Sequence, residues 1–194
     1  MRLLRLTTAD DMIAVYLTAE IVSERFGGRI MALLQRDGMH RNIVEAPDIT
    51  NVRENAYRRQ LLAGYRPYVF EELPSHTVWY RALLMREEVA NVRYIDYSYW
   101  NEISNGTRLP AKAIEAIKAG RVLYGESTQV FLSVAQALRE GAHFPELIVV
   151  GTAPDAQLTV YEGHVRLTAY ILAPECLPAE LEVIAGFAPE CDRI

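Results

Sequence analysis

The sequence predicts an α+β fold, in which a small mixed sheet with flanking helices follows a helical N-terminal extension. Apolar residues in the first third of the chain recur at three- and four-residue spacing, which is typical of amphipathic helices. From about residue 125 onward, helical and extended patterns follow each other in the order helix, strand, strand, helix, strand. A chain of 194 residues, 51% of them hydrophobic, is also long and apolar enough to bury a core.

Two helices are expected in the first 40 residues of the N-terminal extension, which spans residues 1–70. The first should begin at Thr8, which forms a capping pair with Asp11, and it should stop at Gly27-Gly28. A shorter second helix should end at Asp37-Gly38. The apolar face of the first helix comprises Met12, Val15, Tyr16, Ala19, Val22 and Phe26.

A third helix should start after Asn51, place Glu54 at its third position and end near Gly64. It carries three arginines that we interpret as part of a solvated face, with the lining of a pocket as the alternative: Arg53, Arg58 and Arg59.

Residues 65–75 contain proline and aromatic residues and form the best candidate for a domain boundary. The second domain would then span residues 76–194. Alternating apolar residues favour a strand over residues 76–85. A helical insertion is expected at about residues 95–125, including a helix that starts at Pro110.

The remaining elements are the clearest in the sequence. A helix capped by Ser127 should end at Gly141. Strands are then expected at residues 147–150 and 158–161, and a helix at 164–173. A last strand at residues 181–184 completes the unit.

One short segment carries chemistry, the run Glu162-Gly-His-Val-Arg166 between a strand and a helix. A glycine at such a turn lets a ligand approach the backbone, and the free N–H groups of the helix N-terminus attract a phosphate. Arg166 can add a bidentate contact, while Glu162 can hold Mg²⁺ or act as a general base and His164 can shuttle a proton. The alternative is structural, with Glu162 and Arg166 as a surface ion pair and His164 as a capping side chain.

Around this motif the sequence resembles the ParB/sulfiredoxin superfamily, over about residues 127–187. The resemblance rests on residues 137–141, on Phe144-Pro145 and the apolar run that follows, and on the acidic-Gly-His-x-Arg motif at 162–166. It implies a ParB/sulfiredoxin-like sheet and a site that takes a nucleotide or phosphorylated small molecule together with Mg²⁺. The residues implied to bind phosphate or nucleotide are Gly163, His164 and Arg166, with Gly141, Phe144 and Pro145 near the base or sugar.

The sequence departs from two branches of that superfamily. His164 stands where sulfiredoxins carry their reactive cysteine, so we do not expect sulfinic acid reduction. The segment after Arg166 is too short for the helix-turn-helix domain that follows the nucleotide motif of ParB partition proteins. The closer resemblance is to free-standing members, including a nucleotide-dependent serine kinase branch. It implies phosphotransfer or nucleotide hydrolysis, with Glu162 and His164 as the catalytic candidates.

Charge and composition exclude some other classes. The chain has 20 basic and 25 acidic side chains, a net charge of −5, which argues against nucleic-acid binding. No apolar run is long enough to cross a membrane, no secretory signal is apparent, and we expect a cytoplasmic protein. Two cysteines and four scattered histidines suggest neither a disulfide framework nor a metal site.

Two other functions stay open. The first is a non-enzymatic regulatory or interaction module, in which side chains such as those of Tyr97 and Trp100 would fill the motif turn. The second, ranked last, is DNA binding or nuclease activity. The amphipathic first helix is also compatible with a homodimer.

Overall fold

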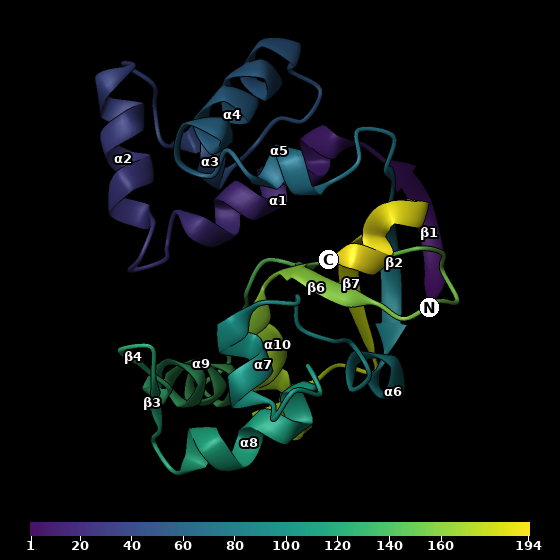
Figure 1. The fold of residues 1–194 in the computed structure, drawn as a ribbon. Coiled ribbons are helices and arrows are strands. Elements are labelled where there is room, and N and C mark those ends of the chain that lie inside the picture. The colour runs from purple at the N-terminus through teal and green to yellow at the C-terminus, as the bar shows by residue number, and fades with distance from the viewer.

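A five-stranded mixed sheet organises the chain, and the computed structural model describes all residues from 1 to 194 (Figure 1). The strand order is β1-β2-β7-β5-β6, with β5 and β7 parallel and every other neighbouring pair antiparallel. The strands span Arg2–Thr7 (β1), Val78–Met85 (β2), Leu147–Gly151 (β5), Thr159–Glu162 (β6) and Glu180–Phe187 (β7). The architecture is therefore mixed α/β, as the sequence predicts at this level.

Helices cover both faces of the sheet (Figure 1). The N-terminal helices lie on one face: α1 (Ala9–Glu20), α2 (Gly27–Arg36), α3 (Asn42–Glu45), α4 (Val52–Tyr65) and α5 (Val69–Glu72). The later helices lie on the other: α7 (Ser98–Ile103), α8 (Pro110–Lys118), α9 (Gln129–Arg139) and α10 (His164–Leu172). Shorter elements complete the chain: α6 (Arg86–Val89), β3 (Val122–Leu123), β4 (Glu126–Ser127), η1 (Pro174–Cys176) and η2 (Pro189–Arg193).

The side chains of β5 alternate between two apolar cores, one on each face of the sheet. Successive side chains of a strand point to opposite faces. Leu147 and Val149 accordingly pack with the later helices, whereas Ile148 and Val150 pack with the N-terminal helices. All four residues are buried, which is why this strand appears in the sequence as an unbroken apolar run.

The start of the N-terminal extension differs from expectation. Residues 2–7 do not belong to a helical segment but form β1, which pairs with β2 at the edge of the sheet. The segment is mostly exposed on both of its faces. Its apolar residues therefore do not alternate with polar ones, which is the pattern that would identify a strand. Helical structure begins at Ala9, after Thr8 has capped α1 as predicted. The N-terminal helices then share one apolar core with the sheet.

The ends of the first two helices also differ from expectation. Helix α1 stops at Glu20, well before Gly27-Gly28, and these two glycines open α2. Gly27 lies so close to the preceding turn that a β-carbon would stand 2.3 Å from the carbonyl oxygen of Ile21. The glycine is needed here for a close backbone approach rather than for ending a helix.

Several other boundaries are confirmed. Asn51 caps α4 by accepting hydrogen bonds from the N–H groups of Arg53 and Glu54. Pro110 is the first residue of α8. The four expected elements after residue 145 are present as β5, β6, α10 and β7, although β7 is longer than predicted. The N-cap of α9 is Thr128 rather than Ser127.

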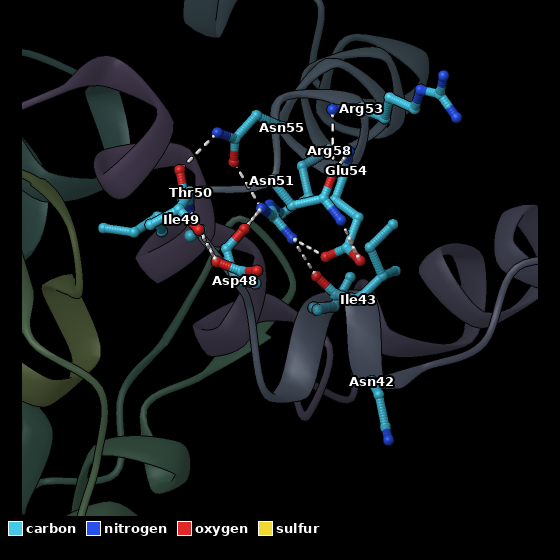
Figure 2. A network of polar contacts seen from close by, with 12 residues as sticks. Asn42, Ile43, Asp48, Ile49, Thr50, Asn51, Arg53, Glu54, Asn55 and Arg58 are labelled. Atoms are coloured by element: carbon cyan, nitrogen blue, oxygen red, sulfur yellow. Dashed lines mark hydrogen bonds and ion pairs between the residues drawn. The ribbon is translucent and has the colours of Figure 1, made fainter.

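Arg58 is fully buried, so the solvated-face interpretation of α4 is wrong at this position. Its guanidinium donates hydrogen bonds to the carbonyl oxygens of Ile43 (2.8 Å) and Asp48 (2.7 Å) and to the Asn55 amide oxygen (2.5 Å), as Figure 2 shows. The Ile43 carbonyl lies in α3 and the Asp48 carbonyl after it, where the latter also accepts from the N–H of Asn51. The side chain of Arg59, next in sequence, is half exposed as expected.

None of the helices combines the length and the apolar character that crossing a bilayer requires.

Candidate functional site

Gly163 joins β6 to α10 in a conformation that favours glycine. Its φ is +101°, in the left-handed region. A β-carbon would stand 2.6 Å from Cδ2 of Leu147 and 2.9 Å from Nη2 of Arg166. The local backbone of the motif therefore depends on this glycine, both for its torsion angle and for the space that its neighbours occupy.

The N-terminus of α10 is uncapped. Gly163 has no side chain that could accept a hydrogen bond, and the first turn of the helix contains no acidic residue. The first intrahelical bond runs from the N–H of Leu167 to the carbonyl of Gly163. The N–H groups of the three preceding residues, His164 to Arg166, therefore have no acceptor within the helix, which makes this end a positive pole.

Arg166 faces inward and connects two segments of the site. Its guanidinium donates a 2.7 Å hydrogen bond to the carbonyl oxygen of Pro145 and pairs with the carboxylate of Glu162. Burial raises the pKa of Glu162, and the charge of Arg166 opposes that rise. The motif and the turn before β5 thus meet in space, as the resemblance implies, but the ion pair is largely buried rather than on the surface.

His164 packs among aromatic rings. Its imidazole stacks on the indole of Trp100, with ring centroids 4.6 Å apart and an interplanar angle of 15°, and Tyr94 lies at 6.0 Å. Burial lowers the pKa of His164 to about 3, and two arginine charges, of Arg166 and Arg66, act in the same direction. The imidazole is therefore neutral near pH 7. Its Nε2 atom is buried without a hydrogen-bond partner.

The side of the turn that faces α7 is partly filled. Trp100 occupies it by stacking on His164, whereas Tyr97 remains 60% exposed. A cavity of about 280 Å³ borders Pro145, but its walls come from α1, β2 and the segment after α3, and no residue of the motif lines it. The aromatic packing therefore limits the approach of a ligand to the remaining sides of the turn.

The resemblance also implies Gly141, Phe144 and Pro145 as residues near the base or sugar of a nucleotide. Gly141 ends α9 with a φ of +87°, as expected of a helix cap. Phe144 packs against a small apolar cluster between α9 and the second half of α10, which includes Ala135 and Ala169. Of Gly141, Phe144 and Pro145, Pro145 is the one that forms a hydrogen bond with the motif.

A second, largely buried ion pair lies among the N-terminal helices, and the sequence analysis did not identify it. Arg66 follows α4 and donates a 2.5 Å hydrogen bond to Glu20 at the end of α1. Glu20 also accepts a 2.6 Å hydrogen bond from the hydroxyl of Tyr65. No local pattern marks Arg66 and Glu20 as partners, because 46 residues separate them in the chain.

The N-terminal helices also contact the end of β6 directly. Tyr161, the residue before Glu162, donates its hydroxyl to the carboxylate of Glu72 (3.0 Å) and to the carbonyl of Val69 (3.3 Å). The segment that contains Arg66 and α5 is therefore held against the strand that carries the motif.

The residues fit a protein-bound magnesium ion poorly. Glu162 is already paired with Arg166, and Glu20 with Arg66, so neither carboxylate is free. No group of three or more His, Cys, Asp or Glu side chains is arranged to hold a metal ion. Mg²⁺ is commonly bound through substrate phosphates with one or two carboxylates, so any ion here would have to be bound largely by the ligand itself.

Comparison of the chain with protein-family models, with curated proteins and with solved structures gives no match.

Proposed function

We propose that the β6–α10 turn binds the phosphate groups of a nucleotide. The observation that carries this proposal is the uncapped N-terminus of a nine-residue helix, preceded by a left-handed glycine and without any acidic residue in its first turn. Such an end offers N–H groups and a partial positive charge to an anion. The buried, unpartnered Nε2 atom of His164, the first residue of this helix, is a further polar group that a ligand can satisfy.

The resemblance of residues 127–187 to the ParB/sulfiredoxin superfamily supports a nucleotide rather than a simple anion. In this proposal Arg166 either turns toward a phosphate or holds the turn in shape from behind. Its present bonds to Pro145 and Glu162 favour the second role. A phosphotransfer or hydrolysis step would need Glu162 to leave Arg166 and act as a general base.

A non-enzymatic interaction module is the second candidate. The stacking of Trp100 on His164 favours it, because this packing fills one side of the turn without any ligand. The net charge of −5 continues to argue against DNA binding as the third.

The test is calorimetric titration with ATP, ADP, CTP and GTP in the presence of Mg²⁺, on the wild type and on Val165→Glu. Val165 is the second residue of α10. A carboxylate there repels a phosphate, so the variant should lose nucleotide binding. Because the Val165 side chain is partly buried against the apolar core of the later helices, circular dichroism checks that the variant is folded. Val130→Glu controls for an added carboxylate at the second position of a helix, since Val130 is the second residue of α9 and is exposed.

Binding to the wild type and to Val130→Glu, but not to Val165→Glu, would support a phosphate site at α10. Trp100 supplies a second readout, because a ligand that reaches His164 should change the fluorescence of the indole stacked on it. Absence of binding to the wild type at millimolar nucleotide would contradict the proposal and favour the interaction module.

A further inference from the structure

Arg66 is held in a fixed orientation by its neighbours. Its guanidinium lies 3.7 Å above the ring centroid of Phe26 and also pairs with the hydroxyl of Tyr68. The aromatic ring and the carboxylate of Glu20 restrict the guanidinium from two sides. Its Nε–H group is nevertheless buried without a hydrogen-bond partner. Arg66 therefore keeps a spare donor in an oriented guanidinium.

This arginine acts on the same turn as Arg166. The contacts of Tyr161 with Val69 and Glu72 hold the segment after Arg66 against the end of β6. The positive charge of Arg66 contributes to the low pKa of His164 and opposes the rise in the pKa of Glu162. The contacts of Tyr161 thus place the segment that begins at Arg66 beside the residue that precedes Glu162.

The charges of the whole cluster cancel. Glu20 offsets Arg66 and Glu162 offsets Arg166, so the partial charge of the α10 N-terminus is the excess positive charge among these groups. This partial positive charge can attract one phosphate group. A second phosphate needs a second cation, and Arg66 is the more accessible of the two arginines, with 19% of its side chain exposed against 10% for Arg166.

We propose that Arg66 is the second phosphate-binding residue of this site, and that the ligand is a nucleoside di- or triphosphate rather than a monophosphate. This inference rests on the proposed function of the β6–α10 turn. One phosphate is bound at the N-terminus of α10, and the next is bound by Arg66, which exchanges Glu20 for the ligand. The N-terminal helices are then part of the binding site.

The experiment compares ATP, ADP and AMP, with CTP and CMP as a second series, on the wild type, Arg66→Gln and Glu20→Gln. Losing one charged hydrogen-bond donor should weaken ATP binding about tenfold or more and leave AMP binding unchanged. Arg66→Gln should therefore lose the preference for ATP over AMP. Arg59→Gln is the matched control, because Arg59 is a half-exposed arginine of α4 that pairs with Asp10.

Glu20→Gln should have the opposite effect. It removes the charge that competes for Arg66 while keeping an oxygen for the hydroxyl of Tyr65, so ATP should bind more tightly than to the wild type. A gain in affinity cannot result from misfolding.

If the wild type binds nucleotides but Arg66→Gln retains the preference for ATP over AMP, the inference about Arg66 is overturned and the phosphate site at α10 stands. If the wild type binds no nucleotide, the proposed function itself is overturned, and the inference with it.

Discussion

Replacing Gly163 with alanine adds one methyl group to the turn of the candidate site and should lower the free energy of unfolding by about 2–4 kcal/mol. About 1–2 kcal/mol of this comes from the left-handed φ of +101°, which an L-residue with a β-carbon rarely adopts. The rest comes from overpacking, because the new methyl group would stand 2.6 Å from Cδ2 of Leu147.

Neither neighbour of that methyl group can move freely. Leu147 is buried in the sheet, and the guanidinium of Arg166 is bound to Pro145 and Glu162. The collision should therefore be relieved only by moving the first turn of α10 or by breaking the ion pair. Either change costs stability and also disturbs the proposed phosphate site.

Urea unfolding followed by circular dichroism measures the effect, with Gly141→Ala as the matched control. Gly141 also has a left-handed φ, +87°, but a β-carbon there would meet nothing within 4 Å. It isolates the conformational cost, about 1–2 kcal/mol. Gly163→Ala should cost at least about 1 kcal/mol more, a further decrease in Tm of roughly 2–4 °C. Equal losses in the two variants would refute the reasoning that packing around Gly163 restricts the turn.

The remaining predictions concern a buried arginine, a helix cap and a buried histidine. Arg58→Ala should destabilise the fold by about 3–5 kcal/mol in urea unfolding, because it removes a fully buried side chain and its buried hydrogen bonds to the Ile43 carbonyl and the Asn55 amide oxygen. Arg59→Ala should cost at most about 1 kcal/mol, and similar losses in the two variants would contradict the network of Figure 2. Asn51→Ala should cost about 1 kcal/mol through loss of the α4 cap, and Asn51→Asp should restore most of it in the same assay. The pKa of His164 is lowered to about 3 in the folded protein, whereas in the unfolded chain it is about 6.5. As the pH falls below about 6.5, this histidine is therefore protonated in the unfolded chain but not in the folded protein. By pH 5 the difference should lower the free energy of unfolding by about 2 kcal/mol. The free energy of unfolding should fall less between pH 7 and pH 5 in His164→Gln than in the wild type or in the exposed control His143→Gln. The raised pKa of Glu162 changes the stability in the opposite direction as the pH falls, but Glu162 is present in all three proteins.

Local features of the fold could be predicted from the sequence because neighbouring residues determine them. Asn51 caps α4 through the N–H groups of the next turn, and Pro110 opens α8 because its fixed φ suits the first helical position. The apolar run at residues 147–150 identified the strand that the structure shows as β5. The glycine of the β6–α10 turn was predicted at the correct position for the same reason, since its torsion angle and the start of the helix are local.

Only the tertiary structure decided which distant segments meet. Residues 2–7 become a strand because β2, more than 70 residues later, offers them a partner edge. Arg58 is buried because the carbonyls of Ile43 and Asp48 converge on it. A charged side chain has the same local pattern on a surface helix and in a buried network, so the sequence does not distinguish them.

The candidate site divides in the same way. The motif from Glu162 to Arg166 was recognisable from its own residues. The ion pair of Glu162 with Arg166 and the filling of the turn by Trp100 were among the alternatives, but the burial of the pair and the presence of Arg66 and Glu20 were not recognisable. The stacking of Trp100 and the pairing of Arg66 with Glu20 join residues that are distant in sequence, whereas Glu162 and Arg166 are only four residues apart. The long-range contacts form only when the helices that carry these residues pack together, because burial then forces each charge to find a partner.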